Sequence, residues 1–444
     1  MTGADLMAVM AVLGAALILL LLLGLCKRFA MSSELLRKLA HLGTGLLAMS
    51  FPWIFSSLQP VLLVCGFALM LLGAVSFIPA VRSRLGASLY SVGRSSHGEF
   101  YFPIAVPILF WLARGDKLLY FIPLLVLTLA DAVAAILGSI YVKLPYEGIG
   151  GSKSVEGSVA FFTVAFFAVH VPLLLSSQLS RPQSLLAALD IALVVTLLEA
   201  VSWRGLDNLV IPLGVLLLLH VYTALSVRFL VYRLIAALIL LAFVVLYRSR
   251  TTLQHTALIA AALVLYASWG AGGWQWFIAP TVLFACYSMF LPDRQLSASR
   301  KDNVYAVASV ASAGLLWICV ARFTNDPTLI FPYTAAYTAH FSLLGWTLCV
   351  LRNPAQSAWK RGPILLIECW ALMFVPYLFI AGPLRQHVIH ALLALPVCGL
   401  AFALFCIVEP RHGGLYSDGG WRWLREAALV LLVTSPLALM GGVP

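Results

Sequence analysis

The fold class is decided by stretches such as LLYFIPLLVLTLADAVAAILGS, residues 118–139, in which Asp131 is the one charged residue among mostly apolar side chains. A helix needs roughly 20 mostly apolar residues to cross a bilayer. Stretches of this kind follow one another from residue 5 to residue 442 with short polar interruptions. We count about 16 of them, so roughly 320 residues would lie in lipid, and no room is left for a soluble domain of ordinary size. The sequence therefore predicts an all-α, polytopic integral membrane bundle of about 16 transmembrane helices.

The composition excludes a soluble fold. The 444-residue chain is 62% hydrophobic and 10% charged, whereas an ordinary soluble domain has about 25% charged residues. Its 28 Lys and Arg against 17 Asp and Glu give a formal net charge of +11. We expect this basic excess to follow mostly from membrane topology, so it does not indicate a nucleic-acid partner. The eight cysteines lie in apolar runs without CxxC spacing, and we interpret them as small buried side chains.

The positions of the basic residues predict an orientation. We expect residues 4–25 to be a retained first helix rather than a signal peptide, because this stretch lacks a basic start and is followed by Lys27 and Arg28. An even number of spans places both termini on one side. If that side is outside, about 21 of the 28 Lys and Arg lie inside and about 7 outside. The positive-inside rule therefore predicts both termini outside and the inner loops in the cytosol. The spans are expected near 5–25, 38–57, 60–80, 100–113, 118–139, 158–177, 184–203, 209–226, 229–247, 254–269, 274–291, 304–322, 330–350, 363–382, 387–408 and 426–442.

The two halves of the chain differ in kind. Acidic residues and a Gly/Ser/Lys-rich loop concentrate before residue 215, and the remainder is mostly apolar helix with short loops. We predict an N-terminal transmembrane helix over residues 1–32, a functional membrane domain over 33–225, and an additional helical region of unknown function over 226–444.

Ionisable residues at membrane depth are candidates for function, because each costs about 2.5 to 3.5 kcal/mol on insertion scales. In the predicted topology, those of the first half gather on the inner face of the membrane. They are Glu34, Arg37, Lys38, His41, Arg94, His97, Glu99, Asp131, the acids and lysine of residues 147–158, Glu199 and Asp207 with Asn208. Several inner loops thus present acids, bases and amides to one cytosolic face.

The strongest local signal is the loop EGIGGSKSVEGS, residues 147–158, which runs directly into an apolar helix. Its glycines let backbone N–H groups approach phosphate oxygens, Lys153 adds a positive charge, and Ser154 or Ser158 can cap a helix N-terminus that favours anions. The P-loop spacing GxxxxGK[ST] is absent, because Ser152 separates Gly151 from Lys153, and no strand is predicted before the loop. The loop predicts phosphate binding; a flexible connection whose lysine marks the inner side is the alternative.

A nucleotide site with a divalent cation needs oxygen ligands, because Mg²⁺ binds carboxylates and bridges phosphate groups. Asp131, Glu156 and Asp207 are the candidates. Each also has a purely structural interpretation: an ion pair inside the bundle for Asp131, a first-turn acid favoured by the helix dipole for Glu156, and an ordinary turn for Asp207. His41 and His97 are general bases by type, although an interfacial histidine is more often a satisfied polar residue.

Five blocks of sequence together resemble the polyprenol kinase family, which includes dolichol kinase, phytol kinase and related CTP-dependent diacylglycerol kinases. The order and spacing of all five agree, which is more specific than any one block. The resemblance covers residues 33–225, and nothing in the remainder contributes to it. The blocks are Arg37 and Lys38 with His41; residues 97–103; residues 131–135 with Gly138; residues 151–158; and Glu199 with Asp207, Asn208 and Pro212.

The resemblance implies transfer of the γ-phosphoryl group of CTP to the hydroxyl of a membrane lipid alcohol, a dolichol, another polyprenol or phytol, at the cytosolic face. We assign catalytic roles to Asp131, Asp207 and Lys153, and binding of Mg²⁺ or another divalent cation to Asp131, Glu156 and Asp207. Which carboxylate is base and which is ligand stays open. The nucleotide contacts are expected from Arg37, Lys38, Gly150, Gly151, Ser152, Lys153, Ser154, Glu156, Gly157 and Ser158. His41, His97, Glu99, Glu199 and Asn208 are expected to complete the polar shell.

Two other functions stay open. A lipid cytidylyltransferase also uses CTP at the inner face, but the Lys-Asp, Gly-His-Gly-Gly and Asp-Arg-Asp arrangement of that family is not found. A transporter or lipid-handling protein would line a path through the membrane, and Asp190 and Glu368 are isolated intramembrane acids that fit such a path. For residues 226–444 the alternatives are a pocket for an isoprenoid tail, a module with its own activity, or scaffold helices.

Overall fold

The computed structural model describes residues 3–28, 33–78, 98–148, 151–248, 251, 253–290, 304–352, 358–382, 384–409 and 420–439. The chain divides into two compact units, Met1–Leu238 (unit 1) and Ile239–Pro444 (unit 2), and the boundary falls inside one helix, α13 (Val227–Tyr247). The predicted functional division near residue 225 lies at the start of this helix and stays a prediction.

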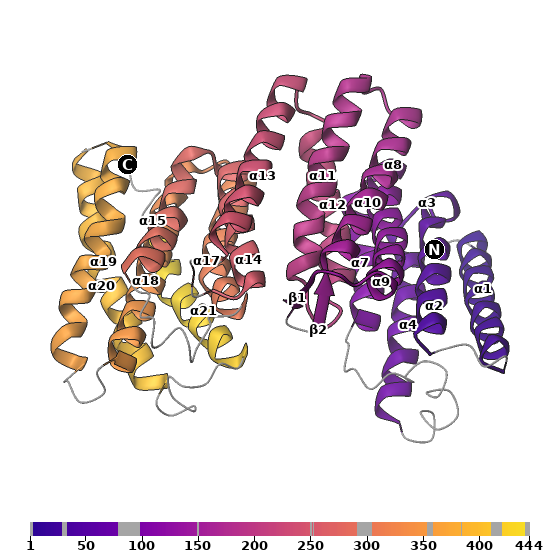
Figure 1. Cartoon of the computed structure of the whole chain (residues 1–444), viewed down its shortest axis with the longest axis horizontal. Helices are drawn as coiled ribbons and strands as arrows, with labels where there is room; N and C mark the ends of the chain where they lie inside the picture. The colour runs from indigo at the N-terminus through magenta and orange to yellow at the C-terminus, as the bar shows by residue number, and fades with distance from the viewer. Residues whose placement is uncertain are drawn as a thin grey trace. The chain divides into compact units, whose positions relative to one another are not determined.

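Unit 1 is a helical bundle with one small hairpin (Figure 1). The predicted span at 118–139 is a continuous helical segment, Lys117–Ile140, that changes from α to π and back to α. Besides α13, the elements of unit 1 are α1 (Gly3–Arg28), α2 (Ser33–Met49), α3 (Phe51–Ile54), α4 (Leu58–Phe77), α7 (Gly98–Leu112), α8 (Lys117–Leu125), the π-helix η2 (Val126–Ala130), α9 (Asp131–Ile140), β1 (Pro145–Gly148), β2 (Gly151–Ser154), α10 (Val155–Ser176), α11 (Arg181–Val201) and α12 (Asp207–Tyr222).

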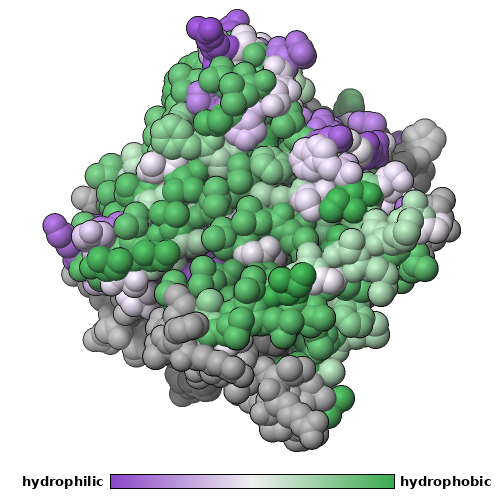
Figure 2. Space-filling model, turned by 90° about the vertical axis from the view of Figure 1, so that its right-hand side faces the viewer, coloured by the Kyte–Doolittle hydropathy of each residue, from purple (hydrophilic) through white to green (hydrophobic). Residues whose placement is uncertain are grey.

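The helices confirm an all-α, multi-pass membrane bundle. Among the residues that the structure describes, ten helices are long and apolar enough to cross a membrane. Their apolar side chains are widely exposed, as lipid contact requires: Phe77 is 83% exposed. Figure 2 shows a face of the molecule that is largely apolar, with hydrophilic residues gathered at its margins. The ten helices do not confirm the predicted number of about 16; α7 and α12, at 15 and 16 residues, are apolar but shorter than a full span.

The sequence predicts no strand before the loop over residues 147–158, and this prediction is wrong. Residues on both sides of the glycines form an antiparallel hairpin in which Pro145 pairs with Ser154 and Tyr146 with Lys153. Ser154 then caps α10, since its side chain accepts a hydrogen bond from the backbone N–H of Gly157. Pairing satisfies backbone groups that a free loop would leave to water, and it holds Lys153 at a fixed position between strand and helix.

Glycine allows the helices beside the hairpin to approach closely. A Cβ on Gly157 of α10 would lie 3.2 Å from the Ala134 carbonyl oxygen and 3.3 Å from the Gly138 Cα atom of α9. A Cβ on Gly45 of α2 would lie 2.2 Å from Thr128 Oγ1 in the π-helix. Small residues at such contacts let helix backbones pack closely within a membrane. They bring α2, α9 and α10 together beside the site described below.

Unit 2 is a second helical bundle, built around the largely buried helix α18. Its elements after α13 are α14 (His255–Gly272), α15 (Trp274–Phe290), α17 (Val304–Thr324), the 3₁₀ turn η3 (Pro327–Leu329), α18 (Ile330–Arg352), α19 (Ala358–Ala381), α20 (Arg385–Val408), α21 (Gly420–Thr434) and the 3₁₀ turn η5 (Ser435–Leu439). Helices α15, α17, α19, α20 and α21 all pack against α18. The main hydrophobic core of the unit is formed by side chains from these six helices.

Candidate functional site

Lys38 and Asp131 form the first ion pair of the site. Lys38 lies on α2, Asp131 is the first residue of α9, and Lys38 Nζ is 2.9 Å from Asp131 Oδ2. The lysine side chain is 8% exposed and the aspartate 23%, so the pair is shielded while the carboxylate keeps an accessible side. Asp131 directly follows the π-helix η2. Such π-helical turns inside α-helices occur frequently at functional sites.

His41 adds a second contact to the same carboxylate. It follows Lys38 by three residues on α2, and its Nε2 lies 3.9 Å from Asp131 Oδ2. Its ring packs edge-on against Phe102 of α7, with the ring centroids 6.1 Å apart. Arg37 is exposed on the same helix and contributes positive charge near Asp131. The basic block of α2 is therefore gathered around one carboxylate.

Lys153 and Glu199 form the second ion pair. Lys153 projects from strand β2, and its Nζ lies 2.8 Å from Glu199 Oε1 on the last turn of α11; it also donates to the Glu199 backbone carbonyl oxygen. The lysine side chain is 26% exposed and the glutamate 15%. The loop lysine is thus directed inward to a carboxylate from another helix.

Asp207 and Asn208 begin α12 after a sharp reversal of the chain. Arg204 and Gly205 both have positive φ, 48° and 85°, which turns the backbone between α11 and α12. Asn208 Nδ2 donates to the Gly98 carbonyl oxygen at 3.0 Å and so ties this turn to the start of α7. A Cβ on Gly98 would lie 2.6 Å from Asn208 Nδ2, so this close contact requires glycine.

The Asp207 carboxyl group links the two ion pairs electrostatically. It precedes the predicted span at 209–226. Burial and then the negative charge of Asp131 raise the pKa of Asp207 to about 6, while the positive charge of Lys153 opposes that rise. Each of two nearby carboxylates disfavours the ionised form of the other, and a bound cation would stabilise both in their ionised forms. Asp131 and Asp207 therefore belong to one polar site.

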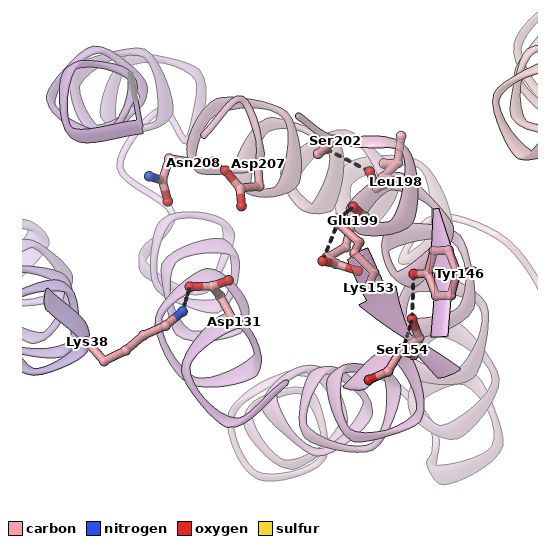
Figure 3. A network of polar contacts seen from close by, with 11 residues as sticks. Lys38, Asp131, Tyr146, Lys153, Ser154, Leu198, Glu199, Ser202, Asp207 and Asn208 are labelled. Carbon is pink, nitrogen blue, oxygen red and sulfur yellow. Dashed lines mark hydrogen bonds and ion pairs between the residues drawn. The ribbon is translucent and has the colours of Figure 1, made fainter. Parts of the chain in front are cut away.

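The side chains of this site face one another from elements far apart in the sequence (Figure 3). Lys38 and Asp131 lie on one side, Glu199 and Lys153 on the other, and Asp207 between them. Mg²⁺ is commonly held by one or two protein carboxylates together with substrate phosphates. Asp131 and Asp207 fit that requirement, and the two lysines supply the positive charge that phosphate groups need.

Glu156 lies apart from this arrangement in its contacts. Its carboxylate oxygens accept hydrogen bonds from the Leu144 backbone N–H at 3.2 and 3.4 Å, across the base of the hairpin. Within the described part of the chain, no group of three or more His, Cys, Asp or Glu side chains is placed to hold a metal ion. In its contacts Glu156 is a first-turn acid that closes the hairpin onto α10, and the three-carboxylate metal set stays a prediction.

Tyr146 is a site residue that was not predicted from the sequence. Its hydroxyl lies 2.9 Å from Ser158 Oγ, which joins β1 to the first turn of α10 beside Lys153 (Figure 3). Burial and then the nearby charge of Glu199 raise the pKa of Tyr146 to about 12, so the phenol stays neutral at physiological pH. The signal that would have identified it is the pairing of Tyr146 with Lys153 across the two strands. Interpreting residues 147–158 as a loop leaves this pairing out.

The remaining predicted residues fall into three groups. Ser152 is exposed on β2, and Ser154 caps α10. Gly157 donates its backbone N–H to that cap, and because it has no side chain it lets α9 pack closely against α10. Glu99 lies in the first turn of α7. Gly150 and His97 lie outside the described residues, as do Arg94 and the side chains of Glu34 and Glu147.

Comparisons with known proteins agree with the resemblance seen in the sequence. No family model matches the chain, and no solved structure matches it. A phytol kinase from Synechocystis sp. is 29% identical to the chain over 193 residues, which are 43% of this chain and 80% of the relative. Over that length the chain is a distant homologue of a lipid kinase, and the comparison confirms its likeness to the polyprenol and phytol kinases.

Proposed function

We propose that unit 1 is a CTP-dependent kinase that transfers the γ-phosphoryl group to the hydroxyl of a membrane lipid alcohol, a dolichol, another polyprenol or phytol, at the cytosolic face. The observation that carries this proposal is the convergence of Lys38–Asp131, Lys153–Glu199 and Asp207 from five separate elements of unit 1. Phosphoryl transfer depends mainly on positioning and charge neutralisation, and this arrangement provides both kinds of group.

Lys153 is the residue we assign to the transferred phosphate. It is held by Glu199, and phosphate oxygens would replace the glutamate oxygens as its acceptors. Because Lys153 sits on a paired strand rather than a free loop, little side-chain and backbone freedom is lost when it changes partner. Ser152 and the backbone of Gly151 are the nearest candidates for further phosphate contacts.

Asp131 and Asp207 are the residues we assign to the acceptor hydroxyl and to a divalent cation. When bound, Mg²⁺ would neutralise the charge of the phosphate oxygens. One of the two carboxylates would accept the proton of the lipid hydroxyl, and Lys38 and His41 keep Asp131 at a fixed position for either task. Tyr146 and Ser158 hold the hairpin against α10, so they act through Lys153.

The membrane determines where the hydroxyl of the acceptor lipid lies. A lipid alcohol places its hydroxyl at the membrane interface and its tail among apolar helices, whereas a nucleoside triphosphate arrives from water. The site lies beside the starts of α10 and α12 and the end of α11, and Asp131 contributes to it from inside the continuous segment Lys117–Ile140, which suits both substrates. The excess of basic residues on the same predicted side supports a cytosolic site with both termini outside.

The decisive experiment uses the full chain in nanodiscs with CTP labelled at either the γ- or the α-phosphate, γ-labelled ATP, and a panel of phytol, short polyprenols and dolichol. The proposal predicts that γ-label from CTP enters one of the alcohols and that Mg²⁺ removal by EDTA stops the transfer. Transfer of α-label would instead identify a cytidylyltransferase. Absence of transfer from both nucleotides to every alcohol would refute the proposal.

A further inference from the structure

Unit 2 has a cavity between four of its helices that the proposed kinase does not use. Helix α14 packs against α15 and α17, and α18 packs against the same two helices, so the four form a ring. Side chains from all four line the cavity, together with Leu253 just before α14. The cavity measures about 580 Å³, counting its open mouth. Sites for small molecules range from roughly 300 to 1,000 Å³, so this cavity is large enough for a ligand.

Small side chains on two of the helices leave this space open. Ala261 of α14 and Ala306 and Ala311 of α17 line the cavity, where larger residues would fill it. All three are buried, and Ala311 is only 3% exposed. Protein interiors are packed about as densely as organic crystals, and apolar space that nothing occupies costs stability in proportion to its volume. A cavity of this size therefore favours a ligand that fills it.

The walls of the cavity are chemically uniform. The described residues that line it are Ala, Val, Leu, Pro, Phe and Tyr, and none of them is charged. Burial of an ionised head group without a partner is strongly unfavourable. Apolar cavities stay dry and take apolar ligands instead. The ligand that these walls select is therefore mostly hydrocarbon and carries no charge.

The cavity is elongated along the helices. Pro280 and Tyr287 of α15 both line it, as do Tyr337 and Leu344 of α18. The two residues of each pair are seven positions apart, which is about 10 Å along a helix at 1.5 Å per residue. Helices α14 and α17 are long and apolar enough to cross a membrane. The shape and the surroundings thus suit a hydrocarbon chain that comes from the membrane itself.

Tyr337 adds one polar group to these walls. Its side chain is buried, and its Oη is shielded from solvent and has no hydrogen-bond partner among the described residues. Tyr333, one turn earlier on α18, donates instead to the Trp276 backbone carbonyl oxygen. The Tyr337 ring is held in place by α17, since a Cβ on Gly314 would lie 2.4 Å from it. A buried hydroxyl without a partner costs stability, and a ligand with one uncharged hydroxyl would remove that cost.

We propose that the cavity of unit 2 binds a neutral lipid alcohol, with its hydrocarbon chain between α14, α15, α17 and α18 and its hydroxyl on Tyr337 Oη. A hydroxyl matches a phenol because each can donate to or accept from the other. A phosphorylated lipid does not match, because none of the described lining residues supplies a positive charge. Binding here requires no nucleotide, so it is a property of unit 2 beyond the phosphoryl transfer proposed for unit 1.

The test is photolabelling of the full chain in nanodiscs, without nucleotide, by a farnesol analogue that carries a diazirine. Mass spectrometry of the peptides identifies the labelled helices. Label on α14, α15, α17 or α18 reports on this cavity, whereas label on unit 1 reports on the proposed acceptor site. We expect saturable labelling of the four helices that unlabelled farnesol blocks and farnesyl phosphate does not block.

Two variants connect this labelling to the cavity. Ala311→Leu fills the space and should raise the half-saturating concentration at least tenfold, whereas Ala308→Leu, at an exposed position of the same helix, is the matched control and should label as wild type. Tyr337→Phe keeps the ring and loses the hydroxyl. It should weaken farnesol binding about fivefold and leave the inhibition constant of farnesene, a hydrocarbon of the same chain length, unchanged.

Saturable label that is confined to unit 1 overturns the proposal, as does wild-type labelling of the four helices in Ala311→Leu. Competition by farnesyl phosphate as strong as that by farnesol overturns the neutral ligand, and unchanged farnesol binding in Tyr337→Phe overturns the hydroxyl contact. Thermal unfolding checks both variants. If Ala311→Leu does not fold, Tyr337→Phe, which keeps the packing of the ring, still decides the outcome. Label on unit 2 without label on unit 1 counts against the kinase acceptor site and supports this one.

Discussion

The two units place their ionisable residues in opposite ways. In unit 1 they lie on a hairpin, at the start of α12 and beside the π-helical turn of the Lys117–Ile140 segment, where Lys153, Asp207 and Asp131 are partly exposed. In unit 2 they lie along the middle of a bundle, where His340 and Glu426 are buried. Partly exposed groups can meet a soluble, highly charged ligand, whereas fully buried groups are shielded from one. The same scarce residue types therefore indicate different chemistry according to their depth.

The largest expected effect comes from Asp131→Asn, which tests whether the partly exposed residues of unit 1 serve chemistry. Loss of a catalytic carboxylate should lower kinase turnover about a thousandfold. Asp116→Asn is the matched control, because Asp116 only caps α8 by accepting from the Leu118 and Leu119 backbone N–H groups, and asparagine caps equally well. Turnover in Asp131→Asn above a tenth of the wild-type value contradicts the assignment.

Lys153→Met tests the phosphate contact. Removal of one charged donor should lower kcat/KM for CTP about a hundredfold, with most of the loss remaining at saturating lipid. Lys143→Met, on the exposed connection before the hairpin, should change kcat/KM little. If Glu199→Gln lowers activity as much as Lys153→Met, the lysine–glutamate pair is structural and the phosphate assignment fails.

Truncation tests whether unit 1 stands alone and where it ends. Leu230 is fully buried in the unit 1 core, Gln183 Nε2 donates to the Leu225 carbonyl oxygen, and Arg233 interacts with the buried Asp190. A chain ending at residue 238 should keep kinase turnover, whereas one ending at 225 should lose about 2 to 4 kcal/mol of stability. Thermal unfolding and turnover in one detergent measure both. Equal stability of the two chains would place the boundary at 225 instead.

Gly157→Ala tests the close helix contact beside the site. The new Cβ would press on backbone atoms of α9 at 3.2 and 3.3 Å, which should cost about 1 to 3 kcal/mol. Gly66→Ala is the control, since nothing lies within 4 Å of its Cβ position and both sites gain the same helix propensity. A lower thermal midpoint for Gly157→Ala than for Gly66→Ala is expected; equal midpoints would show that α9 and α10 separate freely.

The smallest effect is expected from Tyr146→Phe, which removes the contact with Ser158. Loss of one hydrogen bond of about 1 kcal/mol should raise the KM for CTP about fivefold, and Tyr141→Phe at the exposed end of α9 should leave it unchanged. Because the pKa of Tyr146 is raised to about 12, the phenol is neutral at pH 6 to 9. The variant should therefore keep the shape of the pH–rate profile over that range, and a changed shape would argue that Tyr146 takes part in proton transfer.

The glycine-rich loop shows how far sequence reasoning reached. Lys153 was singled out because a lysine among glycines before an apolar helix suits phosphate, and the structure directs it into the site. Glu156 is grouped with the two aspartates because a nucleotide site with a divalent cation needs carboxylate oxygens, but its carboxylate accepts a hydrogen bond from the Leu144 backbone N–H. The difference arises from the hairpin, whose strand pairing depends on residues before the glycines.

By itself the sequence determined the membrane bundle, because runs of apolar residues with few charges have no other stable environment, and it determined which few residues could do chemistry. Only the tertiary structure decided their partners. Lys38 meets Asp131 across 93 residues, Asn208 meets Gly98 across 110, and His340 meets Glu426 across 86. Such contacts depend on how helices pack, and close packing at Gly45, Gly138 and Gly157 is set by the fit of surfaces that no local pattern in the chain encodes.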